Sequence, residues 1–278
     1  MQVSQLLLSA IQQLNELSDS PRLDAEVLLA HSLDKTRTWL ITWPDRDLSE
    51  NEINQFQQLL RRRIAGEPIA HITGQREFWS MSLNVSPDTL IPRPDTELMV
   101  EQILEHYPAD TSITLADMGT GSGAIALALA SERANWKIIA TDRSAAALHI
   151  ARKNARQLTL DNIVFKQGSW FEPLTGTRFN VIASNPPYIA KQDPHLSQGD
   201  VRFEPVSALA SGEDGLDDIR QICEQARQYL EHKGMLIVEH GFDQKSEIRE
   251  IFTINGYQTI TQVHDLSQNP RLTFGFNP

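Results

Sequence analysis

The chain has little cysteine: Cys223 is the only one among 278 residues. A single cysteine excludes an internal disulfide framework and any cluster of thiolate ligands within one chain. Because Cys223 lies in the apolar-periodic stretch 219–230, we expect a buried structural thiol rather than a nucleophile. This use of cysteine indicates the cytoplasm as the compartment.

Long hydrophobic runs are also missing. No apolar stretch approaches the roughly 20 residues that a membrane-spanning helix requires. The stretch 1–17 has no basic region and carries Gln, Asn and Ser between its leucines, so we read it as an amphipathic helix and not as a signal peptide. We therefore expect no membrane partner.

Positive charge is scarce. Lys and Arg number 25 against 36 Asp and Glu, which gives a net charge of −11. Such a chain is repelled by phosphate backbones unless its basic residues gather in one place. The only dense basic run, 61–63, lies at the end of a predicted helix, where cations favour the negative end of the helix dipole. Nucleic acid is therefore a poor first guess for a direct partner.

Metal-ligand spacing is missing among the eight histidines. We read His71, His240 and His264 as ordinary polar side chains. Together with the single cysteine, this pattern predicts a protein without a bound metal.

What the chain does have begins with a run of helices. Apolar residues recur at helical spacing from the N-terminus onward. Ser20 and Pro21 supply an N-cap and a proline at the first helical position, and Ser49 with Glu52 forms a capping box. We predict a small helical domain over 1–70. It contains no catalytic constellation, and we assign it to docking of the substrate.

The pattern changes after residue 70. Alternating apolar residues around Gly74 predict a β-hairpin linker over 71–92. From 93 to 278 short apolar strands alternate with helices, which predicts a mostly parallel α/β sheet with helices on both faces. The last two predicted strands, 257–263 and 272–276, are joined by a short connection that fits an antiparallel edge.

A glycine loop follows the first predicted strand of this domain and opens a helix. Its glycines let the backbone turn tightly and approach a ligand, and Asp142, at the end of the second strand, can accept hydrogen bonds from both hydroxyls of a ribose. The loop fits a dinucleotide or S-adenosylmethionine. Asp117 favours the second, because a carboxylate suits an ammonium and a sulfonium and would oppose a pyrophosphate. The loop residues that we expect to bind the cofactor are Asp117, Gly119, Thr120, Gly121, Ser122 and Gly123.

The tetrapeptide Asn185-Pro186-Pro187-Tyr188 follows an apolar strand, at the end where open α/β sheets hold their ligands. The Asn185 carboxamide can accept a hydrogen bond from a planar –NH₂ group. Proline has no N–H, which leaves the Pro186 carbonyl free to accept the second hydrogen, and Tyr188 offers a flat face for stacking. Two acceptors aimed at both hydrogens leave the nitrogen lone pair pointing at the methyl carbon. The tetrapeptide therefore predicts methylation of a planar exocyclic nitrogen, by alignment rather than by a strong base.

At this point the chain resembles a known family, the N5-glutamine methyltransferases of peptide-chain release factors (the PrmC/HemK family). The likeness covers nearly the whole chain. The Asn-Pro-Pro-Tyr motif is shared with adenine-N6 DNA methyltransferases, whereas IPRPDTE (91–97) and the segment 204–209 are more particular to this family. The segments that carry the resemblance are 74–78, 91–97, 117–123, 185–189, 203–205, 208–209 and 212–216.

The resemblance implies a Rossmann-like class I methyltransferase sheet, with S-adenosylmethionine as cofactor and S-adenosylhomocysteine as product. It implies that the substrate is the glutamine in the Gly-Gly-Gln (GGQ) tip of class 1 release factors, and we expect a monomeric enzyme. The residue Trp170 is expected beside the adenine, and Asn185 between cofactor and target. The residues assigned to catalysis are Asn185, Pro186 and Tyr188, and those assigned to substrate binding are Asn185, Pro186, Pro187 and Tyr188.

Three other functions stay open. An adenine-N6 nucleic-acid methyltransferase needs a positively charged groove and a pocket for a flipped base, which the net charge disfavours. A binding module without catalysis is disfavoured because Asp142, Asn185 and Tyr188 are all present. A nicotinamide-dependent dehydrogenase gives no account of the Asn-Pro-Pro-Tyr motif.

Overall fold

The computed structural model describes all residues, 1–278. They form two compact units, Met1–Gln75 and Arg76–Pro278, and each unit has a hydrophobic core of its own. None of the helices combines the length and the apolar character that a membrane crossing requires.

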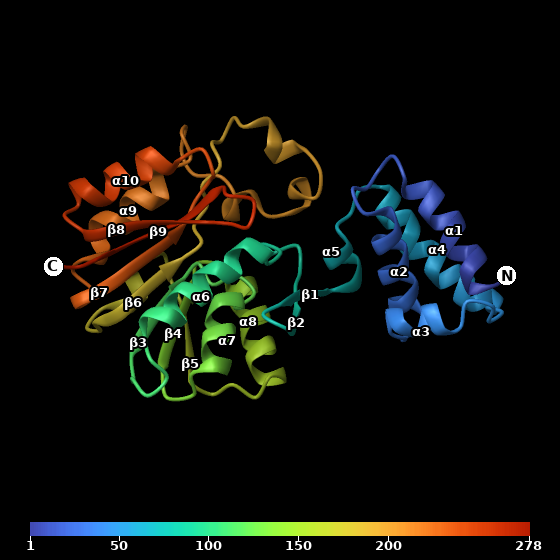
Figure 1. Cartoon of the computed structure of the whole chain (residues 1–278), viewed down its shortest axis with the longest axis horizontal. Coiled ribbons are helices and arrows are strands. Elements are labelled where there is room, and N and C mark those ends of the chain that lie inside the picture. Colours follow the sequence, from blue (N-terminus) through green and yellow to red (C-terminus); the bar gives the residue numbers. More distant parts are fainter. The chain divides into compact units, whose positions relative to one another are not determined.

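The first unit is helical, which confirms the prediction from the sequence (Figure 1). Its helices bury their apolar faces around Leu28, Leu29 and Phe56, which are fully buried. The sequence did not predict the last helix, since five residues are too few for a periodic pattern. The helices are α1 (Val3–Leu14), α2 (Pro21–Ser32), α3 (Arg37–Thr42), α4 (Glu50–Ile64) and α5 (Ile69–Thr73).

Helix ends in this unit confirm one predicted cap and correct another. Ser49 Oγ accepts from the Glu52 N–H (3.3 Å) and a Glu52 oxygen accepts from the Ser49 N–H (2.8 Å), as a capping box requires. Helix α2 begins where predicted, but Ser20 makes no capping bond. Its hydroxyl donates to Asp24 instead (3.2 Å). The buried Asp24 also pairs with Arg63 of the basic run (2.8 Å). A buried carboxylate needs hydrogen-bond partners, and the Ser20 hydroxyl is one of those that Asp24 uses.

The second unit is built around a seven-stranded sheet of order β5-β4-β3-β6-β7-β9-β8 (Figure 1). Strands β3 to β7 pair in parallel, while β9 is antiparallel to both of its neighbours. The predicted sheet with an antiparallel edge is thus confirmed. The strands are β3 (Thr114–Met118), β4 (Lys137–Asp142), β5 (Ile163–Gln167), β6 (Phe179–Ser184), β7 (Leu230–Glu239), β8 (Gln258–His264) and β9 (Pro270–Phe276).

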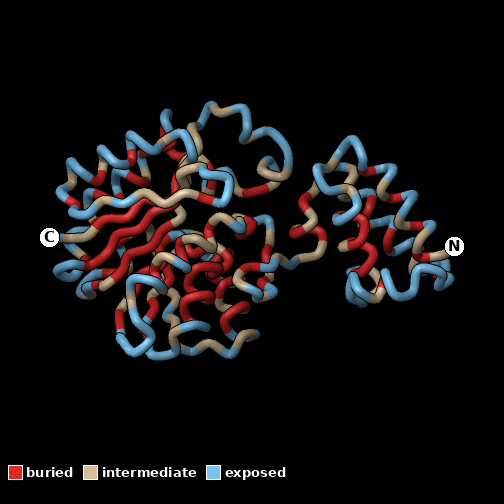
Figure 2. Tube along the Cα trace, viewed as in Figure 1, coloured by how far each residue is buried: buried red, intermediate tan, exposed pale blue.

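Helices cover both faces of this sheet, and its central strands are buried (Figure 2). Side chains alternate between two cores, as the pleat requires. In β6, Val181 and Ala183 face the core shared with α6, α7 and α8, whereas Ile182 faces the core shared with α9 and α10. The helices are α6 (Glu97–His106), α7 (Ala124–Glu132), α8 (Ala145–Gln157), α9 (Asp217–Ala226) and α10 (Lys245–Ile254).

Strand β7 begins five residues before its predicted start at Met235. The sequence pattern extended α9 to Leu230, but the helix ends at Ala226. Pairing with β6 decides the boundary, because Phe179 N–H donates to the Tyr229 carbonyl (2.8 Å) and Phe179 pairs with Leu230. Within α9 the thiol of Cys223 is fully buried, as predicted.

The predicted β-hairpin is present but shorter, with strands β1 (Gln75–Phe78) and β2 (Met81–Asn84). Phe78 and Leu83 belong to the core under α6 and α7. The Asn84 backbone N–H donates to Asn154 Oδ1 on α8 (2.8 Å). These residues therefore pack as part of the second unit. The functional division at residues 70 and 92 stays a prediction.

Candidate active site

The glycine loop joins β3 to α7 and depends on three left-handed glycines, Gly119, Gly121 and Gly123, with φ of 72°, 57° and 91°. L-residues rarely adopt these angles. The Gly119 and Thr120 N–H groups both donate to the Thr141 carbonyl of β4 (2.9 Å each). These bonds hold the loop beside the end of the next strand.

Asp142 ends β4 and lies against this loop. One of its carboxylate oxygens accepts from the Gly121 N–H (3.0 Å) and the other from the Ser144 N–H (2.8 Å). A carboxylate oxygen has a second lone pair, so both oxygens can still accept from a ligand. This placement fits the predicted ribose contact.

Asp117 lies behind the loop and not on the wall of the cavity described below. It is fully buried, and its Oδ2 accepts from the Thr120 hydroxyl (2.6 Å) and from the Ala126 N–H (3.1 Å). Burial raises the pKa of this carboxyl to about 6. The bonds of Asp117 brace the loop and the first turn of α7, and its contact with a cationic ligand stays a prediction.

A cavity of about 290 Å³ opens in front of the loop. Gly123 lies outside its wall and acts in packing, because a Cβ there would come within 2.9 Å of Leu127 Cδ1. The cavity joins segments that are far apart in sequence. Of the residues predicted to form the site, its wall holds Gly119, Thr120, Gly121, Ser122, Asp142, Trp170, Asn185 and Pro187.

Trp170 forms one side of the cavity. Its backbone has a φ of 43°, which is strained for a bulky residue. The indole N–H donates to Asp218 at the start of α9 (3.2 Å). A Cβ added at Gly119 would lie 3.6 Å from the indole ring. The ring is thus fixed next to the glycine loop.

Asn185 follows β6 and is the member of the tetrapeptide with a polar side chain that lines the cavity. Its Nδ2 donates to the Thr96 hydroxyl (3.2 Å). Pro187 also lines the cavity, whereas Pro186 and Tyr188 do not. The Tyr188 hydroxyl donates to Glu239 (3.4 Å), and its ring packs on the core under α9 and α10. The predicted stacking of Tyr188 on a target stays a prediction.

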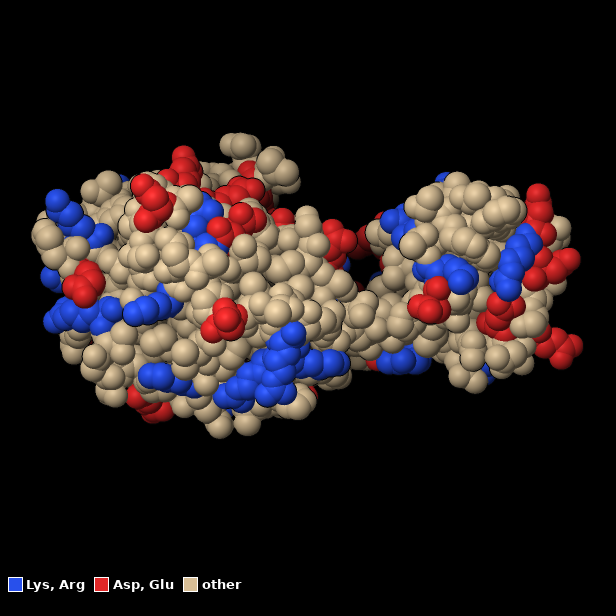
Figure 3. Space-filling model, turned by 90° about the horizontal axis from the view of Figure 1, so that it is seen from below, with Lys and Arg blue, Asp and Glu red and all other residues tan.

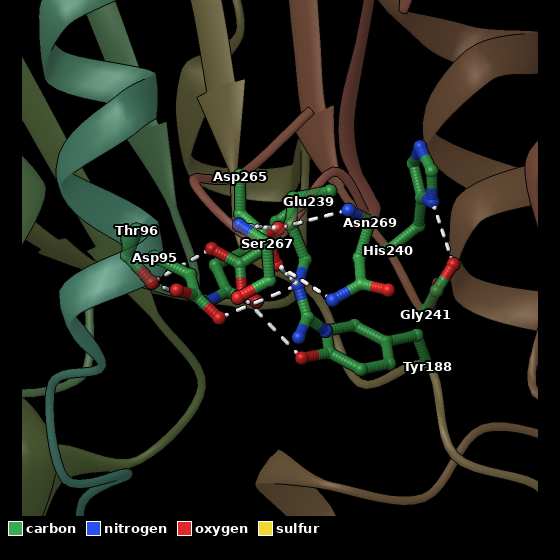
Figure 4. Close-up of polar contacts among 11 residues, drawn as sticks. Asp95, Thr96, Tyr188, Glu239, His240, Gly241, Asp265, Ser267 and Asn269 are labelled. Carbon is green, nitrogen blue, oxygen red and sulfur yellow. Dashed lines mark hydrogen bonds and ion pairs between the residues drawn. The ribbon is translucent and has the colours of Figure 1, made fainter. Parts of the chain in front are cut away.

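Sequence reasoning missed Glu239 and Thr96. Glu239 ends β7, and Thr96 ends the 3₁₀ turn η1 (Pro94–Thr96). The Thr96 hydroxyl donates to Glu239 at 2.7 Å, and both residues are buried (Figure 4). Burial, with a smaller contribution from the nearby negative charge of Asp95, raises the pKa of Glu239 to about 7. Only the position of Glu239 at the carboxyl end of a parallel strand could have indicated it.

Two of the segments that carry the family resemblance, 91–97 and 203–205, also contact each other beside the cavity. Glu204 is buried, accepts from the Ile91 N–H (2.9 Å) and pairs with Arg93. Arg93 and Pro205 line the cavity. The ion pair therefore joins the segment before α6 to the loop before α9, and both segments contribute to the cavity wall.

Comparison with known proteins places this geometry in a family. Residues 5–74 match the family model of the PrmC N-terminal domain, and residues 109–270 match that of a methyltransferase domain. A solved structure of a methyltransferase from Pyrococcus furiosus shares the fold, with a TM-score of 0.54 at 17% identity over 80% of this chain and 98% of that one.

Relatives that match over nearly the whole chain have a higher sequence identity. The release factor glutamine methyltransferase of Vibrio cholerae is 51% identical over 271 residues, which cover 97% of this chain and 94% of the relative. That of Escherichia coli is 48% identical over 275 residues, 99% of each chain. The matched stretches cover both units of the chain. The chain belongs to the family of release factor glutamine methyltransferases.

Proposed function

We propose that this chain transfers a methyl group from S-adenosylmethionine to the side-chain nitrogen N5 of the glutamine in the GGQ motif of class 1 release factors. The observation that carries the proposal is one cavity whose wall holds both the glycine loop with Asp142 and the amide of Asn185. A nucleoside donor and a planar acceptor can therefore meet there. S-adenosylhomocysteine is the other product.

The cavity fits the donor. Asp142 retains lone pairs for ribose hydroxyls, and the backbone at Gly119 and Gly121 leaves room where side chains would project. Trp170 supplies an aromatic face for the adenine. When bound, S-adenosylmethionine supplies a methyl group on an activated sulfonium.

The acceptor amide is oriented by Asn185. With Nδ2 bonded to Thr96, the Oδ1 atom is the end of the carboxamide that is left to accept from an N–H of the glutamine. The Pro186 carbonyl is proposed for the second hydrogen and Pro187 for the wall beside it. Because the amide is a weak nucleophile, alignment is the main contribution, about 7–11 kcal/mol in favourable cases.

The helical unit is proposed to dock the body of the release factor. One glutamine offers few distinguishing atoms, so specificity requires contacts elsewhere on the partner. The unit exposes Ile41 and Trp43 at the end of α3, and large apolar side chains of this kind anchor protein contacts.

The alternative is methylation of adenine N6 in a nucleic acid. Figure 3 shows Lys and Arg side chains gathered at more than one place on the larger unit, but the net charge of −11 opposes a nucleic-acid partner. We also keep the expectations of a cytoplasmic monomer without a metal.

The test uses the purified chain, a release factor and methyl-labelled S-adenosylmethionine, with peptide mass spectrometry to locate the label. We expect label on the GGQ glutamine that is lost in Asn185→Ala and kept in Gln228→Ala, an exposed amide after α9. Label on adenine in an oligonucleotide, and none on the release factor, would overturn the substrate.

A further inference from the structure

The buried carboxylate of Glu239 is linked by hydrogen bonds to both polar side chains of the Asn-Pro-Pro-Tyr motif, directly to Tyr188 and through Thr96 to Asn185. Glu239 Oε2 accepts from the Thr96 hydroxyl (2.7 Å), and Glu239 Oε1 accepts from the Tyr188 hydroxyl (3.4 Å). Thr96 in turn accepts from Asn185 Nδ2 (3.2 Å). Figure 4 shows Thr96 and Tyr188 approaching Glu239 from separate segments.

The chemistry of these groups fixes the direction of each hydrogen bond. Above the pKa of Glu239, which is about 7, the carboxylate is ionised and only accepts, so the single hydroxyl hydrogen of Thr96 is directed at Glu239. The Thr96 oxygen then has only lone pairs to offer Asn185. The carboxamide must therefore present its Nδ2 to Thr96. The opposite rotation would set Asn185 Oδ1 against the Thr96 oxygen with no hydrogen between them.

This direction is the one that the reaction requires. With Nδ2 turned to Thr96, Oδ1 is the atom available to accept from an –NH₂ group in the cavity. A reversed carboxamide would turn its own –NH₂ toward the –NH₂ of the target and could not orient it.

A carboxylate at this position is expensive for the fold. Glu239 is fully buried, and Asp95 adds a second negative charge nearby. Arg271 offsets part of this charge, although it also pairs with Asp95 (3.3 Å) and Asp265 (2.9 Å). An apolar residue would be cheaper to bury, which indicates that the acceptor itself is needed.

We propose that Glu239 is a positioning residue that fixes the orientation of the Asn185 carboxamide through the Thr96 hydroxyl. The proposal rests on the proposed function, because it needs an acceptor with a planar –NH₂ group. Neither Glu239 nor Thr96 donates or removes a proton in the transfer. They act by selecting one of the two rotations of Asn185.

The test compares Thr96→Val with Thr96→Ser, and Glu239→Met with Glu239→Gln. Valine and methionine keep volume but remove the hydroxyl or the acceptor. Serine keeps the hydroxyl, and glutamine offers an acceptor in one of its two rotations. We expect kcat to fall about tenfold to a hundredfold in Thr96→Val and Glu239→Met, to fall less in Glu239→Gln, and to be largely restored in Thr96→Ser. Affinity for S-adenosylmethionine should change little.

The double variant Thr96→Val with Glu239→Met separates this role from a general loss of structure. Because Thr96 acts only along the path from Glu239 to Asn185, whereas Glu239 also bonds Tyr188, the kcat of the double variant should be no lower than that of Glu239→Met alone. Multiplied losses, or wild-type kcat in Glu239→Met, would overturn the proposal. The wild-type assay tests the proposed function separately. If only adenine is methylated, the release-factor substrate is wrong, and the same variants then test the positioning role of Glu239 with adenine as the acceptor.

Discussion

Gly121 and Asp142 are 21 positions apart and are joined by a hydrogen bond of 3.0 Å from the Gly121 N–H to Asp142 Oδ2. This bond links the tip of the glycine loop to the end of the neighbouring strand. It places the carboxylate where the loop leaves space for a ligand. The two features that the sequence presents separately thus lie side by side on the wall of one cavity.

Asp142→Asn should weaken binding of S-adenosylmethionine. The amide replaces one acceptor oxygen with a donor, so either the Gly121 N–H or the Ser144 N–H loses its partner, together with the ribose hydroxyl on the same atom. Hydrogen bonds to charged groups are worth about 1.5–3 kcal/mol, so Kd should rise about tenfold to a hundredfold. Isothermal titration calorimetry measures this. Asp161→Asn, an exposed carboxylate outside the cavity, is the control, and an unchanged Kd in Asp142→Asn would contradict the assignment.

Gly123→Ala should destabilise the fold. The residue has a φ of 91°, and a Cβ there would lie 2.9 Å from Leu127 and 3.2 Å from Ala151. Backbone strain and overpacking together should cost about 2–4 kcal/mol. Gly176→Ala is the matched control, since Gly176 has a φ of 77° but open space around it, and should cost about 1–2 kcal/mol. Urea unfolding that gave equal losses would show that α7 and α8 shift to accept the methyl group.

Local patterns predicted much of this molecule, and long-range contacts account for what they missed. The glycine loop and the tetrapeptide were found because each is short and follows an apolar strand. The hydrogen bonds of Asp117 behind the loop could not be predicted, since sequence spacing does not say which side of a turn a side chain takes. Glu239 and Thr96 are 143 positions apart, and only the order of β6, β7 and the turn before α6 brings them together.

If the helical unit docks the release factor, substitutions on its surface should weaken methylation of the intact release factor but not of a short peptide. Ile41 and Trp43 are 67% and 56% exposed. Ile41→Ser and Trp43→Ser should raise KM for an intact release factor about tenfold, as for a contact worth more than about 1 kcal/mol. A short peptide that contains the GGQ sequence should be methylated at the wild-type rate. Leu266→Ser, at an exposed leucine of the second unit, is the control. Equal losses on protein and peptide would place the effect in the active site instead.

Glu239 should also make the stability of the protein depend on pH. Its pKa is about 7 in the folded chain against 4.5 for the ordinary side chain, mainly because of burial. Between these values the folded state binds the proton more tightly than the unfolded state does. Stability therefore falls as pH rises from 4.5 to 7, by about 3 kcal/mol at the full shift. Asp95 adds to the shift and Arg271 opposes it, and the hydrogen bonds from Thr96 and Tyr188 favour the ionised form.

Glu239→Gln removes this titration and keeps the shape of the side chain. Relative to the wild type, the variant should gain about 2–3 kcal/mol of unfolding free energy between pH 5 and pH 8, measured in urea. Asp117, whose pKa is raised to about 6, titrates in both proteins and cancels in the comparison. A gain that does not depend on pH would mean that Arg271 and the two hydroxyls already compensate the buried charge. A gain at pH 8 in a variant with reduced kcat would show that the fold gives up stability to hold Asn185 and Tyr188 in place.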